Sequence, residues 1–259
     1  MAMAQLNGRP VTVEELAKLA LTNYGHFTSF RIEDGCVRGL GLHLDRLIRD
    51  CRELFGADLD AGRLRHHIRN AAPATGTATV RVTVFDPAID PGSPDLARDP
   101  HTLVTARAAA GSAPTAFTAR TTTYVRDAPE VKSVGLFGSL HHRRAARLNG
   151  FDDALFADPT GHVSEGATWN IGLYDGSDVI WPDAACLSGV TMRLLRQAHR
   201  HRTMRVRVSD LAGMEAAFAT NAAIGVREIS RIDGVAFHPA HPIIEALRTA
   251  YAAVPPETI

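Results

Sequence analysis

Residues 131–170 read VKSVGLFGSLHHRRAARLNGFDDALFADPTGHVSEGATWN, and the predicted fold is built outward from them. The stretch opens with Lys132 and continues into a helical pattern over residues 140–148, which ends at Asn149-Gly150, a frequent helix stop. A short strand is expected at residues 153–156, and a turn separates that strand from Glu165. A lysine, a helix, a strand and a carboxylate therefore follow one another in a single stretch.

Lys132 is one of two lysines in a chain that contains 26 arginines. The other, Lys18, falls in a short helical segment that a capping signature opens at Thr12, where a solvated lysine is ordinary. Lys132 is followed by Gly135 and Gly138, and small residues let a bulky group approach the backbone. If the chain carries out amine chemistry through a lysine, the choice lies between these two.

A lysine amine attacks a carbonyl only when it is unprotonated, so its pKa must be lowered by burial or by a nearby positive charge. Glu165 lies 33 residues after Lys132. Such a carboxylate could keep the ring nitrogen of a pyridoxal phosphate protonated and so preserve the ring as an electron sink. The alternative is that Lys132 is a surface charge and Glu165 a turn residue, because most lysines and glutamates are solvated.

The composition is that of a soluble globular protein, with 45% hydrophobic and 22% charged residues. The formal net charge is zero, so no overall field recruits nucleic acid or an anionic membrane. The basic stretch at residues 193–208 contains no aromatic residues between its arginines. A solvated helix face followed by a strand explains it, and we therefore expect no nucleic-acid partner.

Three widely spaced cysteines form no CxxC or zinc-type spacing, which predicts reduced thiols, no metal site and a cytoplasmic protein. No apolar run approaches the ~20 residues that span a bilayer, so no membrane association is expected. The first ten residues lack the charged start and apolar core of a signal peptide.

Alternating and helical hydrophobic patterns predict mixed α/β structure. A turn at Asn7-Gly8, a hairpin from residues 26–32 and 36–38, and helices at 42–55 and 59–72 are expected first. Strands at 77–85 and 101–106 follow. Residues 107–116 are small and contain Gly and Pro, so they are the expected linker between two domains, residues 1–110 and 117–259. The second domain is expected to contain strands at 117–125, 170–174, 179–181, 216–220 and 226–232. Residues 187–191 are expected to open a helix that runs through about residue 199, and a closing helix is expected at 242–252.

Several of these pieces together resemble the class IV, or fold type IV, pyridoxal-phosphate aminotransferases. That family includes branched-chain and D-amino acid aminotransferases, (R)-selective amine transaminases and aminodeoxychorismate lyase. The resemblance covers nearly the whole chain. The matching pieces, in the family's order, are Leu42-His43-Leu44-Asp45-Arg46-Leu47, Lys132, Asn149-Gly150-Phe151-Asp152-Asp153-Ala154, Val163-Ser164-Glu165 with Asn170, Leu187 to Thr191, and Phe218-Ala219-Thr220-Asn221.

The resemblance implies roles for individual residues. Lys132 looks like the catalytic lysine that forms the internal aldimine and shuttles the proton, and Glu165 like the carboxylate on the pyridine nitrogen. Arg46 looks like the phosphate-binding arginine, whose planar fork suits a phosphate. The remaining cofactor-binding residues are helix N-terminal and loop positions that face the same phosphate: Val190, Thr191, Asn221 and Ala222. A helix N-terminus after a glycine is also an anion site on physical grounds.

Two positions depart from the family's pattern. Members often carry a hydroxyl where Ala222 falls, so its backbone N–H, Thr220 or Asn221 has to serve instead. Many members place a tyrosine a few residues after the lysine, where this chain has Phe137. Tyr124 is another possible source of that phenol.

Substrate-binding residues are expected near the first hairpin and on one strand. His26 and Phe27 resemble residues that border the substrate pocket in the family, although Phe27 could equally be core and the family often has Glu where Thr28 falls. For a substrate carboxylate the candidates are Arg31, Arg81 and Arg126. Arg81 is the one placed at the site, with a structural salt bridge as the alternative.

The resemblance implies an α/β, two-domain fold type IV enzyme with pyridoxal 5'-phosphate in the cleft between the domains, and a homodimer. The leading hypothesis is an aminotransferase that moves an amino group between an amine or amino acid and a keto acid or ketone through Lys132. One alternative is a lyase of the aminodeoxychorismate type, toward which Asn221-Ala222 leans. The other is a non-catalytic protein that binds the cofactor on the same fold.

Overall fold

The computed structural model describes residues 4–109 and 115–259. The chain divides into two compact units. Unit 1 consists of Met1–Gly111, Val131–Gly135 and Pro256–Ile259, and unit 2 of Ser112–Glu130 and Leu136–Pro255. Residues 110–114, which belong to the expected linker at 107–116, lie outside the described residues.

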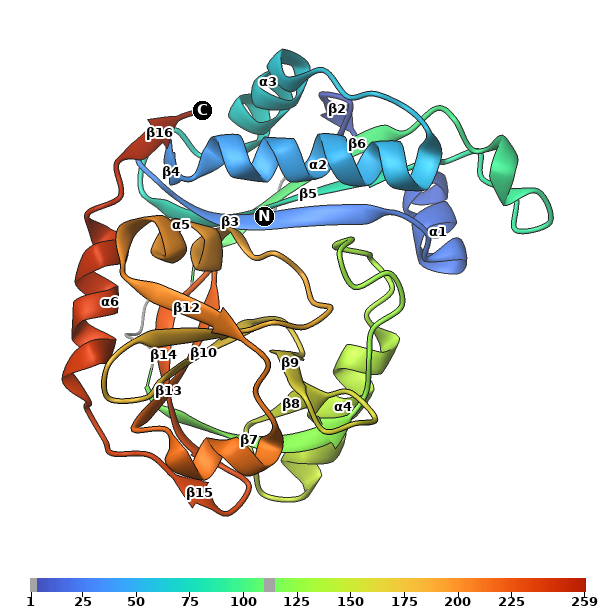
Figure 1. Cartoon of the computed structure of the whole chain (residues 1–259). Helices are drawn as coiled ribbons and strands as arrows, with labels where there is room; N and C mark the ends of the chain where they lie inside the picture. The colour runs from blue at the N-terminus through green and yellow to red at the C-terminus, as the bar shows by residue number, and fades with distance from the viewer. Residues whose placement is uncertain (1–3, 110–114) are drawn as a thin grey trace. The chain divides into compact units, whose positions relative to one another are not determined.

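Unit 1 is a seven-stranded sheet in the order β16-β4-β3-β5-β6-β1-β2, with helices α2 and α3 on one face (Figure 1). Its elements are β1 (Ala4–Leu6), β2 (Arg9–Pro10), α1 (Val13–Thr22), β3 (His26–Glu33), β4 (Cys36–Arg38), α2 (Leu40–Phe55), α3 (Ala61–Ala71), β5 (Thr77–Phe85), η1 (Pro94–Leu96), β6 (His101–Ala108) and β16 (Pro256–Thr258). All the ladders are antiparallel. The last strand of the chain therefore closes one edge of the first sheet.

Local sequence explains several of these elements. Thr12 and Glu15 form a reciprocal capping box that starts α1. Asn7 and Gly8 both have positive φ, 49° and 82°, as the two central residues of a tight hairpin require. Helix α2 buries apolar and polar residues on the same face, which is unusual and concerns the site described below.

Unit 2 is a nine-stranded sheet in the order β12-β11-β10-β13-β14-β7-β8-β9, with β15 paired to β14. Its elements are β7 (Phe117–Thr123), α4 (Phe137–Leu148), β8 (Asp153–Ala157), β9 (Val163–Gly166), β10 (Asn170–Tyr174), β11 (Val179–Pro182), α5 (Val190–Ala198), β12 (His201–Met204), η2 (Val208–Gly213), β13 (Ala216–Asn221), β14 (Gly225–Ile232), β15 (Val235–Ala236) and α6 (Pro242–Ala252). The β7–β8, β14–β7 and β11–β12 pairs are parallel and the others antiparallel.

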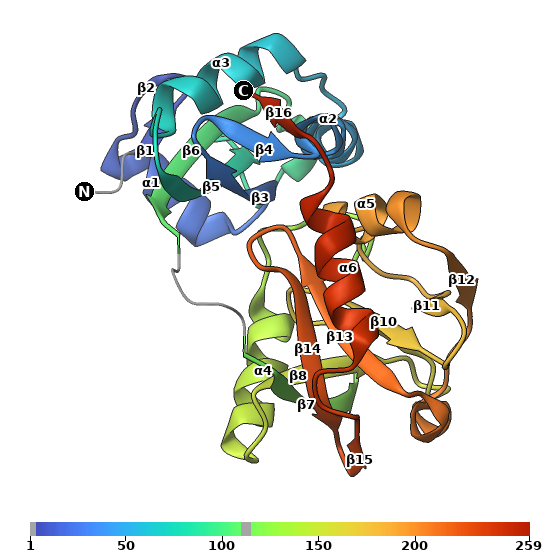
Figure 2. The same ribbon diagram turned by 90° about the vertical axis from the view of Figure 1, so that its left-hand side faces the viewer.

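Separate hydrophobic clusters hold the helices of unit 2 to its sheet. Helices α5 and α6 pack through a cluster that contains Trp181 and Phe218, and Figure 2 shows α6 lying along β13 and β14. Helix α4 packs through a smaller cluster around Phe156. A third cluster contains Trp169 and residues from the central strands.

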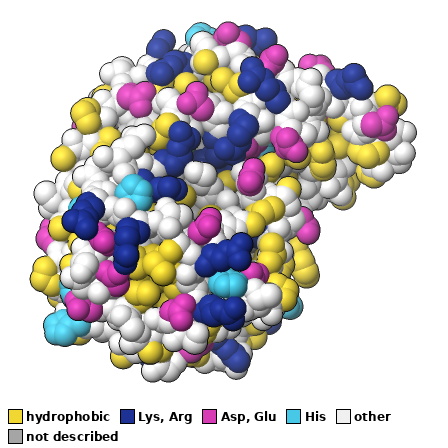
Figure 3. Space-filling view, in the orientation of Figure 1, with side chains coloured by type: hydrophobic (Ala, Val, Ile, Leu, Met, Phe, Trp, Pro, Cys, Tyr) yellow, Lys and Arg dark blue, Asp and Glu magenta, His cyan; other side chains and the backbone are white. Residues whose placement is uncertain are grey.

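Charged side chains of both signs are mixed over the face shown in Figure 3, with one gathering of basic side chains near the centre of the view. The basic stretch at residues 193–208 includes the end of α5 and strand β12, whose Arg200 and Arg202 pair with Asp178 and Asp175 at 2.7 and 2.5 Å. In the part of the chain that the structure describes, no helix has the length and hydropathy to cross a membrane.

Candidate functional site

Lys132 is held by unit 1 through its backbone. Its carbonyl accepts a hydrogen bond from the Phe27 N–H at 2.9 Å, and its N–H donates to Oδ2 of Asp50 at 3.0 Å. The neighbouring Ser133 forms a bridge with His26. These bonds extend the start of β3 and fix the position of the lysine Cα. The side chain lies over Phe27, with Nζ 4.9 Å from the ring centroid.

Arg46 lies in a buried polar cluster on α2. Its side chain donates to Oγ1 of Thr28 and, at 3.2 Å, to Nδ1 of His43. Thr28 Oγ1 also lies 2.7 Å from the same His43 nitrogen. Burial and the charges of Arg46 and Lys132 hold the pKa of His43 well below its ordinary value, so this imidazole is neutral. Thr28 and His43 therefore fix the guanidinium of Arg46.

His26 is fully buried, and neither ring nitrogen has a hydrogen-bond partner among the described residues. Burial, followed by the charges of Arg46 and Arg49, lowers its pKa to about 3. The imidazole is therefore neutral at physiological pH. Its ring centroid lies 6.2 Å from that of Phe55. Its proposed contact with substrate stays a prediction.

Phe27 and Arg81 form a stacked pair on neighbouring strands. The Arg81 guanidinium carbon lies 3.6 Å from the Phe27 ring centroid, and its Nε donates to Thr83 at 3.1 Å. Burial lowers the pKa of Arg81. Stacking and the Thr83 bond hold the guanidinium in one orientation and leave its terminal nitrogens suited to bind an anion.

Glu165 is buried at the end of β9 in unit 2, where its carboxylate is bound on both sides. Oε1 accepts from Nε of Arg126 at 2.8 Å, and Oε2 accepts from the Leu187 N–H at 3.2 Å. The guanidinium offsets the free energy lost by burying the carboxylate. Arg126, a candidate for binding a substrate carboxylate, is thus engaged with Glu165.

The N-terminus of α5 carries no side-chain cap, because its N-cap residue is Gly189. A Cβ at Gly189 would lie 2.1 Å from Oδ1 of Asn170, whose Nδ2 donates to the Leu187 carbonyl at 2.7 Å. The loop before α5 is therefore packed too closely for any larger residue. Val190 and Thr191 form the first turn, whose N–H groups are an anion-binding arrangement.

Two buried hydroxyls strengthen that interpretation. Thr191 and Thr220 are each 1% exposed, and neither Oγ1 has a hydrogen-bond partner in the described part of the chain. Buried polar groups are normally hydrogen-bonded, so an unmatched hydroxyl points to a ligand. Next to Thr220, the side-chain carbonyl of Asn221 accepts from the Ala223 and Ile224 N–H groups, both at 3.0 Å, and shapes the turn that contains Ala222.

The family's pattern has a tyrosine where this chain has Phe137, and Phe137 is 79% exposed at the start of α4. Tyr124 lies in the same unit, packed between His142 and Phe156, and a Cβ at Gly138 would lie 2.1 Å from its hydroxyl. Burial is the main cause that raises the pKa of Tyr124. Its phenol is therefore protonated at neutral pH.

The predicted residues gather in two sets, one in each unit. Unit 1 brings together Lys132, Arg46, His26, Phe27 and Arg81, and unit 2 brings together Glu165, Val190, Thr191, Asn221 and Ala222. Sequence reasoning missed Asp50, which binds the backbone of Lys132. It also missed the contact between His43 and Arg46. The signal was present, because residues 43, 46 and 50 share one face of a helix.

Residues 25–232 match the amino-transferase class IV family. A branched-chain-amino-acid aminotransferase of Pseudomonas aeruginosa is 30% identical over 129 residues, which are 46% of this chain and 42% of that protein. The match to this chain therefore covers less than half the length of this curated relative.

Solved structures share the fold over most of the chain. A branched-chain amino acid aminotransferase from Escherichia coli has a TM-score of 0.83 at 18% identity, covering 97% of this chain and 93% of that one. A branched-chain aminotransferase from Thermoproteus uzoniensis, solved with norvaline, has a TM-score of 0.83 at 20% identity, covering 97% and 94%. A putative 4-amino-4-deoxychorismate lyase of Legionella pneumophila has a TM-score of 0.80 at 20% identity, covering 92% and 93%.

These likenesses confirm the predicted fold, a mixed α/β structure of the aminotransferase type. The family match extends over most of the sequence, and the chain belongs to the class IV aminotransferases.

Proposed function

We propose that the protein is a pyridoxal-phosphate-dependent aminotransferase that moves an amino group between an amino acid or amine and a keto acid or ketone. Membership of the class IV family supports this activity. The observation that carries it is the way Lys132 is held. Its backbone is fixed by Asp50 and Phe27, while its amine extends over an aromatic ring.

Each unit by itself presents residues that suit a part of the cofactor. The uncapped first turn of α5 and the unmatched Thr191 and Thr220 hydroxyls offer donors for a phosphate, and Arg46 offers a guanidinium fixed in place by Thr28. The Glu165 carboxylate would hold the proton on the pyridine nitrogen. When bound, pyridoxal phosphate supplies an electron sink for the substrate carbon that loses its proton.

Lys132 would bond the cofactor and then carry the proton to and from the substrate carbon. Arg81 would bind the substrate carboxylate, since its guanidinium is stacked on Phe27 and oriented.

Absorption spectroscopy tests the proposal. Protein purified with pyridoxal phosphate and dialysed should be yellow, and borohydride should bleach it and fix the cofactor to the Lys132 peptide. Lys132→Ala should lose this band, whereas Lys18→Ala, which changes an exposed lysine on α1, should retain it. Colourless wild-type protein, or a Lys132→Ala variant that matches wild type, contradicts the proposal.

The lyase alternative uses the same residues and is separated by its products. Asn221-Ala222 is the feature that favours it. A direct assay for pyruvate and 4-aminobenzoate from aminodeoxychorismate should be negative, while amine donors should discharge the visible band. The opposite pattern would assign the lyase, and a yellow protein inert in both assays would assign the non-catalytic alternative.

A homodimer belongs to the same proposal. It rests on the class of protein, for which the resemblance implies a pocket completed by a second copy. Sedimentation equilibrium should give about twice the 27.9 kDa mass of one chain. A mass of one chain at working concentration would remove this part of the proposal without touching the cofactor chemistry.

A further inference from the structure

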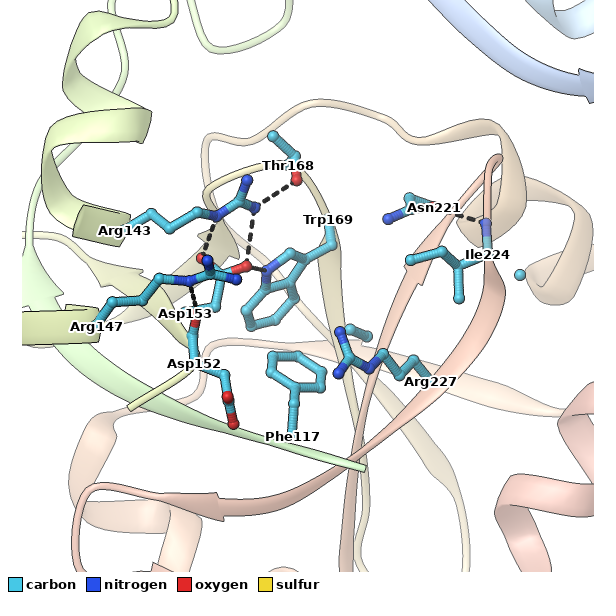
Figure 4. A pocket seen from close by; sticks show the side chains of 12 residues that line it. Phe117, Arg143, Arg147, Asp152, Asp153, Thr168, Trp169, Asn221, Ile224 and Arg227 are labelled. Atoms are coloured by element: carbon cyan, nitrogen blue, oxygen red, sulfur yellow. Dashed lines mark hydrogen bonds and ion pairs between the residues drawn. The ribbon is translucent and has the colours of Figure 1, made fainter. Parts of the chain in front are cut away.

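Unit 2 contains a cavity of about 250 Å³ whose charged lining residues have no role in the function proposed above (Figure 4). Its charged lining consists of three arginines and two aspartates. Arg143 and Arg147 come from α4, and Arg227 comes from β14. Asp153 is the first residue of β8, and Asp152 immediately precedes it. Three guanidinium groups against two carboxylates leave an excess of positive charge in the cavity.

The Asp153 carboxylate is already saturated by protein donors. Its two oxygens accept from Nε and Nη2 of Arg143 at 2.9 and 2.8 Å, and Oδ2 also accepts from Nε1 of Trp169 at 2.9 Å. Nη2 of Arg143 donates in addition to Thr168 at 2.6 Å. This network forms a rigid wall of the cavity, and it neutralises Arg143 locally.

The other carboxylate is also engaged. Oδ2 of Asp152 accepts from the backbone N–H and the hydroxyl of Thr118, at 2.8 and 2.9 Å. The hydrogen bonds to Thr118 are the main cause that lowers the pKa of Asp152, and the charges of Arg227 and Arg147 lower it further. Among the described residues, however, no salt bridge joins Asp152 to either arginine. The two carboxylates therefore do not neutralise these two arginines through direct contact.

Arg147 and Arg227 are oriented through one nitrogen each. Nε of Arg147 donates to the Asp152 carbonyl at 3.0 Å, and Nε of Arg227 donates to the Thr115 carbonyl at 2.6 Å. Arg227 also stacks over Phe117, with its guanidinium carbon 4.4 Å from the ring centroid. Within the described part of the chain, the terminal Nη groups of both have no protein acceptor. They remain available as donors.

A polar donor lies across the cavity. The side-chain carbonyl of Asn221 accepts from the Ala223 and Ile224 N–H groups, and its amide nitrogen has no acceptor among the described residues. Figure 4 shows that nitrogen turned to the Trp169 side of the cavity. Guanidinium and amide donors converging on one small space are suited to the oxygens of an anion.

We propose that this cavity binds a small oxyanion, a carboxylate or phosphate group, through the terminal nitrogens of Arg147 and Arg227. The volume limits the ligand to few atoms, because sites for drug-sized molecules are roughly 300–1,000 Å³. Planar, oriented guanidinium groups bind carboxylate and phosphate oxygens in pairs. This proposal does not depend on the proposed function. Neither Arg147 nor Arg227 has a role in binding the cofactor, and Asn221 is the one lining residue to which the proposed function also gives a role.

Indole N–H resonances provide a readout specific to the site. The chain has two tryptophans: Trp169 lines the cavity, and Trp181 packs in the cluster under α5 and α6. Protein loaded with pyridoxal phosphate and dialysed is titrated at low ionic strength with glutarate and, separately, with inorganic phosphate. Prior loading keeps the phosphate-binding residues proposed above from taking up the probe, and low salt limits screening.

The Trp169 resonance should shift saturably with at least one anion while the Trp181 resonance stays in place. Response to glutarate alone assigns a carboxylate ligand, and response to phosphate alone assigns a phosphate ligand. Combining Arg147→Gln with Arg227→Gln should weaken binding about tenfold or more, because hydrogen bonds to charged groups are lost. An unmoved Trp181 resonance in that variant shows that it is folded.

Arg205→Gln is the matched control, since it removes an exposed arginine of the same unit that does not line the cavity. It should leave the affinity nearly unchanged. Absence of a saturable Trp169 shift with both anions overturns the proposal. Equal weakening in the control does so as well, because the attraction would then be a general effect of charge.

Discussion

Thr28 is the residue on which the orientation of Arg46 depends, because its hydroxyl contacts both Arg46 and His43 inside unit 1. Thr28→Val keeps the shape and removes the hydroxyl. Both partners then lose a buried hydrogen bond, so the free energy of unfolding should fall by about 1–3 kcal/mol. Denaturant unfolding of the cofactor-free protein measures this, and the affinity for pyridoxal phosphate should weaken too.

Thr220→Val is the control for this prediction. The Thr220 hydroxyl is equally buried but has no partner in the described residues, so replacing it by a methyl group should leave the cofactor-free stability unchanged or raise it. Cofactor affinity should nevertheless fall. If Thr28→Val leaves the free energy of unfolding unchanged, the hydrogen bonds of Thr28 to Arg46 and His43 do not stabilise unit 1.

His26 should make stability depend on pH. Its pKa is about 3 in the folded protein, against 6.5 for the unperturbed group. Above pH 6.5 both states are neutral and the residue has no effect. As the pH falls from 6.5 toward 3, only the unfolded chain takes up the proton, so stability should fall by about 1.4 kcal/mol per pH unit.

The measurement is denaturant unfolding at several pH values for wild type and His26→Phe. The variant removes the titrating group and keeps a ring, so its stability should decline less steeply over that interval. His238→Gln, which changes an exposed histidine, should retain the wild-type slope. Identical slopes for all three proteins would show that His26 is not the group responsible.

At the residue scale, the sequence could single out residues with unusual chemistry but not the partners that hold them. Lys132 was prominent because the chain has two lysines. Asp50, which binds its backbone, lies 82 residues earlier, and a carboxylate on an amphipathic helix is usually solvated. Arg126 was considered for substrate binding, whereas the structure pairs it with Glu165.

At the scale of elements, α5 depends on the glycine that precedes it. Gly189→Ala would put a Cβ 2.1 Å from Oδ1 of Asn170. Asn170 is buried and bonded to Leu187, so it cannot swing away freely. Overpacking of this kind should lower stability by about 1–3 kcal/mol and move the first turn of the helix.

Thermal unfolding and cofactor titration check the Gly189 prediction. Both stability and cofactor affinity should fall in Gly189→Ala. Gly213→Ala is the control, because nothing lies within 4 Å of a Cβ at that position, and it should resemble wild type. Normal cofactor affinity in Gly189→Ala would mean that the first turn of α5 does not contribute to binding.

Elements with a clear hydrophobic period were predicted well. Strand β5 was expected at residues 77–85 and α6 at 242–252, as observed. Helix α4 was expected from residue 140 but begins at Phe137. Its buried residues are Ser139 and Ala146, so its first turn buries no large apolar side chain. The hydrophobic pattern of the local sequence therefore could not indicate where the helix starts.

At the scale of the whole molecule, contacts distant in sequence decide which residues belong to which unit. Residues 131–135 join unit 1 because they pair with the start of β3. The last four residues join it because β16 pairs with β4. Neither association has a local signature, so a division into two continuous ranges, 1–110 and 117–259, is all that a linker-like composition could suggest.

Removing residues 256–259 should therefore destabilise the first sheet rather than the neighbouring α6. Ile259 is 6% exposed, and both carboxylate oxygens of Glu257 accept from the Gly41 N–H at the start of α2. Losing a buried side chain, a strand pairing and a charge at a helix N-terminus should lower the free energy of unfolding by about 2–4 kcal/mol.

Far-UV circular dichroism in denaturant measures the change, and tryptophan fluorescence separates the units because both tryptophans lie in unit 2. Ile259→Ala should lose only the part of the free energy of unfolding that is due to the buried Ile259 side chain. A truncated protein with the wild-type midpoint in circular dichroism would mean that β16 is not needed to stabilise unit 1.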